Sequence, residues 1–196
     1  LKADRGHSYK AVLVTHNETA TGVTSDVAAV RRAMDEAHHP ALFFVDTISS
    51  LASTEYKHDE WGVDVTVGGA QKGLMMPPGM SFNAVSDKAI AASKHARLPR
   101  AYWRWDEMLT MNQKGYFPTT PATNLLYGLH EAIAMLREES LPAVFARHAR
   151  HAAAARRAAS AHRASRPCRS PAGDAAALPA SRSTARPARH RRSPRY

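Results

Sequence analysis

Short runs of apolar residues recur along the first half of the chain, separated by polar loops. The runs occupy residues 11–15, 41–45, 63–67 and 80–85. Each has the length of a buried strand. After the first run, apolar residues recur at steps of three and four positions: Val27, Val30, Met34 and Ala37. This spacing predicts a helix, which we expect Ser25 to cap.

Helical patterns dominate the second half of the chain. Residues 86–96 predict a short helix, and residues 121–139 predict a long one with Pro121 in its first turn. Its apolar stripe consists of Leu125, Leu129, Ile133 and Leu136. A further helix is expected from residue 142 to about residue 159, whereas the aromatic stretch 97–120 is expected to be irregular.

The order of these elements predicts the fold class. Strands that alternate with helices and end in polar loops are typical of α/β proteins. The second, third and fourth runs are apolar almost without interruption, as in strands covered on both faces. We therefore predict an α/β domain with a mostly parallel sheet and flanking helices.

Charge is distributed unevenly along the 196 residues. Residues 1–150 hold 16 Lys and Arg and 16 Asp and Glu, so they carry no net charge. Residues 151–196 hold 11 Arg and a single acid, Asp174, and account for the whole formal charge of +10. The basic character belongs to a tail, which argues against a basic globular nucleic-acid-binding domain.

The tail is also of low complexity. Of its 46 residues, 37 are Ala, Arg, Ser or Pro, and none is Ile, Val, Phe or Met. Because so few side chains can be buried, we predict disorder from residue 159 onward. Three origins remain open. The favoured one is a reading-frame shift in a GC-rich gene, and the others are a genuine solvated tail and an arm that neutralises phosphates.

Composition limits the classes of protein further. Cys168 is the only cysteine, so an internal disulfide framework is excluded. No apolar run approaches the roughly 20 residues of a membrane helix. The N-terminus has no signal peptide pattern and no initiator Met, so we interpret it as a cut into a longer sequence. We expect the protein to be cytoplasmic.

Two reactive side chains follow predicted strands. Asp46 ends the second strand, and Lys72 follows the third strand in a glycine-containing loop. Both should lie at the carboxyl edge of one sheet, where α/β proteins bind ligands. An amine that forms a Schiff base and a carboxylate that keeps a pyridine nitrogen protonated match the needs of pyridoxal phosphate. Either residue alone also fits an ordinary solvated turn.

Several motifs together carry a resemblance to a known family. They are residues 14–23 (VTHNETATGV), 45–51 (VDTISSL), 69–73 (GAQKG), 77–79 (PPG) and 117–127 (FPTTPATNLLY). Over residues 8–157 the chain resembles class V aminotransferases of fold type I, and within them the enzymes that use glyoxylate. The resemblance implies transamination from a small amino acid, serine or alanine, to glyoxylate.

The resemblance assigns roles to individual residues. Lys72 would be the catalytic Schiff-base lysine and proton carrier, and Asp46 would pair with the pyridinium nitrogen. Ile48 would pack on the ring of the cofactor. The remaining cofactor-binding residues would be Thr19 near the phenolic oxygen, Gln71 at the phosphate, and Thr120 at the phosphate of a neighbouring subunit. The resemblance therefore implies a homodimer. Thr119 departs from the pattern, because we expect a tyrosine at this position in bacterial members of the family.

Other parts of the family pattern lie outside this sequence. The family's phosphate-cradling helix and its ring-stacking aromatic residue come before residue 1, and its carboxylate-binding arginine comes after residue 150. We thus expect residues 1–140 to be the central part of the large domain, 141–158 a linking helix and 159–196 the tail. We expect the isolated chain to be inactive.

Two rival functions remain. One is another class V reaction, such as a lyase or a desulfurase, although a desulfurase needs a reactive cysteine and Cys168 lies in the tail. The other is a non-catalytic basic protein that binds partners or nucleic acid through residues 151–196, which we regard as the weaker alternative. We expect no metal site and no membrane association.

Overall fold

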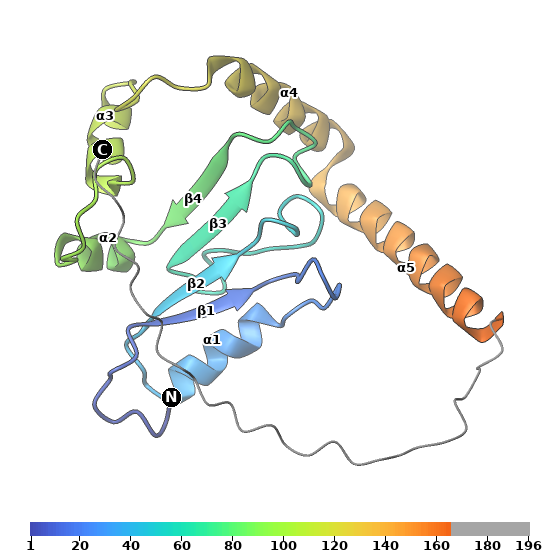
Figure 1. The fold of residues 1–196 in the computed structure, drawn as a ribbon, viewed down its shortest axis with the longest axis horizontal. Helices are drawn as coiled ribbons and strands as arrows, with labels where there is room; N and C mark the ends of the chain where they lie inside the picture. The colour runs from blue at the N-terminus through green and yellow to red at the C-terminus, as the bar shows by residue number, and fades with distance from the viewer. Residues whose placement is uncertain (166–196) are drawn as a thin grey trace, which may run out of the picture.

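The computed structural model describes residues 1–165, and side chains through residue 161. Its centre is a sheet of four strands in the order β1-β2-β3-β4 (Figure 1). The strands are β1 (Ala11–Thr15), β2 (Leu42–Asp46), β3 (Val65–Gly69) and β4 (Ser81–Val85). The first three are parallel and β4 is antiparallel to β3, which confirms the mostly parallel sheet.

Five helices accompany the sheet in the described part of the chain. They are α1 (Val27–Glu36), α2 (Asp87–Lys94), α3 (Trp105–Gln113), α4 (Thr123–Glu139) and α5 (Leu141–Ser165). The prediction of an irregular stretch over residues 97–120 is wrong, because it contains α3. This helix has no buried residue, and its apolar residues Trp105, Met108 and Leu109 form only a short stripe.

The cap of α1 also differs from the prediction. Asp26, not Ser25, accepts the hydrogen bond from the Ala29 N–H group, at 2.8 Å. Ser25 instead donates its hydroxyl to the carbonyl oxygen of Thr15, at 2.8 Å. Both residues are typical caps, and this bond to the end of β1 engages the Ser25 hydroxyl elsewhere.

The last helix is longer than the sequence suggested. It continues through Ser165, past the predicted end near residue 159, and extends away from the sheet (Figure 1). The first residues of the predicted disordered tail are therefore helical. The predictions for residues 166–196, and with them Cys168 and Asp174, lie outside the described residues.

Two hydrophobic clusters hold the layers together. One joins α1 to β2 and consists of Val27, Met34, Ala41, Phe43, Val45 and Val63. The other packs α4 and the start of α5 against the β3–β4 connection, and it consists of Ala70, Leu74, Met76, Ala132, Leu136 and Val144. The second cluster supports the loop that carries Lys72.

The outer strands are less covered than predicted. Leu13 of β1 is 73% exposed, and β4 exposes Ser81, Asn83 and Ala84. The expectation that both faces are covered therefore fails for β4, and β1 and β4 form open edges in the described chain. No helix within residues 1–165 is both long and apolar enough to cross a membrane.

One buried carboxylate connects the amino end of the parallel strands. Asp64 is 5% exposed and accepts hydrogen bonds from the Phe43 N–H group at 2.8 Å and the Ser86 hydroxyl at 2.7 Å. The ammonium of Lys88 lies 3.3 Å from the same carboxylate. The single side chain thus links β2, the approach to β3 and the cap of α2.

We predict that Asp64→Ala lowers the free energy of unfolding by about 3 kcal/mol, because it leaves the buried Phe43 N–H group and the half-buried Ser86 hydroxyl without their acceptor. Asp35→Ala is the matched control, since the Asp35 carboxylate is mostly exposed in its ion pair with Arg31 on α1. The control should cost less than about 0.5 kcal/mol. Urea unfolding measures both values, and equal losses would contradict the central role of Asp64.

Candidate functional site

The carboxyl ends of the parallel strands meet at one edge of the sheet. Thr15 of β1 pairs with Asp46 of β2, and Asp46 pairs with Val67 of β3. The arrowheads of β1, β2 and β3 accordingly point to the same side in Figure 1. The loops that follow these strands carry Thr19, Ile48 and Lys72, so the sheet assembles this part of the predicted site.

The turn after β2 fixes Asp46 and Ile48 relative to each other. An Asp46 carboxylate oxygen accepts a hydrogen bond from the Ile48 N–H group at 2.8 Å, and the Asp46 side chain is otherwise exposed. Thr47 is fully buried and directs both its N–H group and its hydroxyl to the carbonyl oxygen of Val67, at 2.8 and 2.9 Å. The turn is therefore anchored to β3.

The loop after β3 approaches this turn closely. A Cβ atom on Gly69 would lie 3.2 Å from the Gln71 amide oxygen and 3.5 Å from the Ile48 methyl Cγ2. A Cβ atom on Gly73 would lie 2.1 Å from the Leu51 carbonyl oxygen. Glycine at positions 69 and 73 lets the loop after β3 approach the turn after β2. The side chains of Ile48 and Gln71 consequently lie close to the same residue, Gly69.

Lys72 itself is exposed in this loop. Its carbonyl oxygen accepts a hydrogen bond from the Met75 N–H group at 2.8 Å, which shapes the turn after it. Met75 has a positive φ of 58°, uncommon for a residue with a side chain. Asp46 and Lys72 thus extend from adjacent loops with their reactive atoms accessible to a ligand.

Two predicted residues stand apart from these contacts. Thr19 is exposed in the loop after β1, and Thr120 is exposed just before α4. Within the described residues, no hydrogen bond connects Thr19, Lys72 or Thr120 side chains to the other predicted site residues. Nor do three His, Cys, Asp or Glu side chains gather there into a metal-binding group.

His16, the first residue after β1, is buried. It is 3% exposed, and its Nδ1 atom lies 2.9 Å from the Ser50 hydroxyl. Its ring is 5.5 Å from the ring of Tyr56 and 5.9 Å from that of Trp61. Burial lowers the pKa of His16 and raises that of Tyr56. These surroundings give His16 a structural role.

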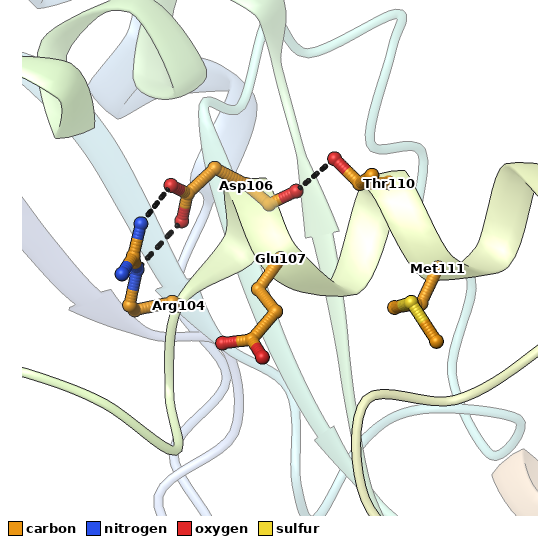
Figure 2. A pocket seen from close by; sticks show the side chains of 5 residues that line it. All are labelled: Arg104, Asp106, Glu107, Thr110 and Met111. Atoms are coloured by element: carbon orange, nitrogen blue, oxygen red, sulfur yellow. Dashed lines mark hydrogen bonds and ion pairs between the residues drawn. The ribbon is translucent and has the colours of Figure 1, made fainter.

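A separate open pocket of about 340 Å³ lies at the start of α3 (Figure 2). It is lined by Arg104, Asp106, Glu107, Thr110 and Met111. Hydrogen bonding to Arg104 lowers the pKa of the Asp106 carboxyl to about 2. Figure 2 shows the guanidinium of Arg104 facing that carboxylate. The two hydrogen bonds between these groups measure 2.5 and 3.2 Å. The two charges satisfy each other, and no predicted site residue lines this pocket.

The sequence reasoning missed the residues that connect the loops. Asn17 and Ser49 join the loop after β1 to the turn after β2, and Ser50 joins His16 to the same turn. All lie inside the recognised motifs. Polar loop residues follow no regular spacing. A hydrogen bond between two such residues that are 32 positions apart, as Asn17 and Ser49 are, therefore cannot be predicted from one sequence.

Comparison with known proteins identifies close relatives. The profile of the family described as aminotransferase class-V matches residues 1–169. The serine–glyoxylate aminotransferase of Methylorubrum extorquens is 53% identical over 154 residues, which cover 76% of this chain and 38% of that protein. The L-aspartate–glyoxylate aminotransferase of Paracoccus denitrificans is 51% identical over 150 residues, with the same coverage of both chains.

Solved structures agree with these sequence relatives. The ureidoglycine–glyoxylate aminotransferase of Bacillus subtilis superposes with a TM-score of 0.64 at 30% identity, over 71% of this chain and 36% of that one. The fold is therefore that of the fold-type I transferases. The chain spans about two fifths of the length of the curated relatives it matches.

We predict that stability falls as the pH drops through the His16 transition. Because burial lowers the pKa of His16 below 6.5, the unfolded chain takes up a proton that the native chain resists. The stability that neutral His16 contributes is thus present above about pH 6.5 and lost as the pH falls toward its lower native pKa.

His16→Asn removes this titration while keeping a polar atom near Ser50. Urea unfolding at several pH values should give a shallower fall in stability for the variant than for the wild type. His148, whose pKa is also lowered by burial and by Arg147, leaves a residual slope in both proteins. Equal slopes would disprove the contribution of His16.

Proposed function

The chain belongs to the class-V aminotransferase family, and from this premise we propose that a protein carrying it moves an amino group from a small amino acid, serine or alanine, to glyoxylate. The observation that carries the proposal is the shared edge of the sheet, where Asp46 ends β2 and Lys72 follows β3. Relatives named for glyoxylate as acceptor support the choice of acceptor.

The residues present fit pyridoxal phosphate, the cofactor of this family. The edge offers an accessible amine, an accessible carboxylate and an apolar side chain, at Lys72, Asp46 and Ile48. The absence of a side chain at Gly69 leaves the Ile48 methyl and the Gln71 amide facing the same small space. When bound, the cofactor supplies an aldehyde that reacts with amines and a ring that accepts electrons.

Lys72 and Asp46 have complementary tasks in this proposal. The Nζ atom of Lys72 takes the proton from the substrate carbon and returns it to a neighbouring atom, as a general base and then a general acid. The carboxylate of Asp46 holds a proton on the pyridine nitrogen and so favours the electron-accepting form of the ring. Asp46 keeps its orientation through the Ile48 N–H group.

The remaining assignments concern binding. Ile48 would pack on the ring, Gln71 would bind the phosphate, and Thr19 would donate its hydroxyl to the phenolic oxygen. Thr120, which is exposed before α4, would reach a phosphate in the neighbouring subunit of a homodimer. The chain on its own should be inactive, because these residues supply neither a ring-stacking aromatic group nor a carboxylate clamp. The cytoplasmic location stays a prediction.

The alternatives make different demands. A lyase would use the same Lys72 and Asp46 but would release a product without a 2-oxo acid acceptor. A basic interaction protein would bind nucleic acid through the arginines of residues 151–196, with an affinity that falls steeply as salt rises. Glyoxylate-dependent formation of glycine separates the proposed reaction from both.

We predict that Lys72→Ala lowers the rate of glycine formation from serine or alanine and glyoxylate at least about 100-fold, because it removes the general base. The assay uses a full-length protein that carries this chain. Lys94→Ala is the matched control, since Lys94 lies at the exposed end of α2 and contacts none of the predicted site residues.

Asp46→Asn tests the second half of the proposal. It keeps the shape of the side chain and an acceptor for the Ile48 N–H group but removes the negative charge, so the rate should also fall strongly.

Unchanged activity in Lys72→Ala would refute the assignment of the catalytic lysine. Turnover that needs no glyoxylate would favour the lyase.

A further inference from the structure

The loop between β1 and α1 is closed by its own hydrogen bonds. Asn17 and Thr24 form an isolated antiparallel bridge. The Glu18 N–H group donates to the Val23 carbonyl oxygen at 2.9 Å, and the Gly22 N–H group donates to the Glu18 carbonyl oxygen at 2.7 Å. Thr19 lies at the exposed end of this small unit, so its position depends on where the whole loop sits.

Two hydrogen bonds connect this loop to the turn after β2. The Asn17 side-chain amide donates to the Ser49 hydroxyl at 3.1 Å, and the Ser49 hydroxyl donates to the Asn17 carbonyl oxygen at 2.5 Å. The other end of the Asn17 amide accepts the Thr24 hydroxyl at 3.1 Å. We call this arrangement, formed by Asn17, Thr24 and Ser49, the Asn17–Ser49 clasp.

We propose that Asn17 and Ser49 are positioning residues, whose clasp sets the distance between the loop that carries Thr19 and the turn that carries Asp46 and Ile48. The inference rests on the proposed function, since it concerns residues assigned there to one cofactor. Ser49 is the next residue after Ile48, and Thr19 is two residues after Asn17. The clasp thus connects the two groups through side chains that lie one and two residues from Ile48 and Thr19.

The surroundings of the clasp explain why it positions the loop and does not hold the fold together. The base of the loop is already fixed, because His16 donates its N–H group to the Asp46 carbonyl oxygen and bonds to Ser50. Asn17 and Ser49 are only half-buried and belong to neither hydrophobic cluster. Loss of the clasp should therefore release the loop while the sheet remains intact.

Amide hydrogen exchange of the 196-residue chain tests the clasp without any cofactor. Ser49→Ala removes both hydrogen bonds between the loop and the turn. It should therefore speed exchange in the peptide that covers residues 17–24 by more than about fivefold, the effect of losing one ordinary hydrogen bond. Exchange in α1 should be unchanged. Asn17→Ala keeps the bond from the Ser49 hydroxyl to the backbone carbonyl oxygen at position 17 but loses the side-chain bonds to Ser49 and Thr24, so it should also speed exchange in residues 17–24. Ser49→Thr, which keeps the hydroxyl, should restore slow exchange.

Ser93→Ala is the matched control, because its hydroxyl bonds within α2 to the Ile90 carbonyl oxygen, at 2.8 Å. It should leave residues 17–24 unchanged. Equal exchange in wild type and Ser49→Ala would overturn the proposal. So would faster exchange throughout the sheet, since that pattern means general destabilisation.

A second measurement links the clasp to the cofactor. In a full-length protein that carries this chain, pyridoxal phosphate is titrated into the wild type, Thr19→Val, Ser49→Ala and the double variant. If the clasp positions Thr19, Thr19→Val weakens binding severalfold in the wild type but much less in Ser49→Ala. Fully independent effects would contradict the positioning role.

The two proposals fail in different ways. A wild-type protein that does not bind pyridoxal phosphate contradicts the proposed function, and with it the cofactor-positioning role. A second outcome contradicts the clasp alone. In it, the wild type binds pyridoxal phosphate and Lys72→Ala disturbs that binding, but Ser49→Ala behaves like the control Ser93→Ala. Binding that weakens in Ser49→Ala and recovers in Ser49→Thr supports both.

Discussion

The buried carboxylate of Asp64 is the constraint on which the rest of this structure depends. It binds backbone and side-chain donors from β2, from the cap of α2 and from Lys88 at the amino end of the parallel strands. A buried charge is stable only when its partners are in place, so these elements must assemble together. The register of β2 and β3 set at the amino end also fixes how the two strands align at their carboxyl ends, where the predicted site residues Asp46 and Lys72 lie.

The sequence predicted β1 and β2 well because each is an apolar run between polar loops. It also located β4, although Ser81, Asn83 and Ala84 of that strand are exposed. It missed α3, whose nine residues bury no side chain and whose first turn instead carries Asp106 and Glu107, which suit the positive end of a helix. It misplaced β3 by two residues, because Val63 and Asp64 are buried without belonging to the strand. Burial and strand pairing are separate properties, and hydrophobicity reports only the first.

For the candidate site, strand order alone was enough to bring Asp46 and Lys72 to one edge. Ile48 and Gln71 lie close together because Gly69 between them has no side chain. The sequence motif includes this glycine but does not show why glycine is needed there. The contacts that connect the loops were unpredictable, since a serine and an asparagine 32 positions apart have no pattern in common. Thr19 and Thr120 remain predictions, because their proposed partners are a cofactor and a second subunit.

The close contact between Gly73 and the Leu51 carbonyl oxygen has a consequence for natural variation. Any side chain at position 73 would have to displace the backbone of the β2 turn, since its first carbon would overlap that oxygen. The position of the Lys72 side chain is thus set partly by Gly73, a residue that has no chemistry of its own. A chain can keep Asp46, Ile48 and Lys72 and still lose their arrangement through a single change from glycine to alanine at position 73, so a list of predicted site residues leaves out a position on which that arrangement depends.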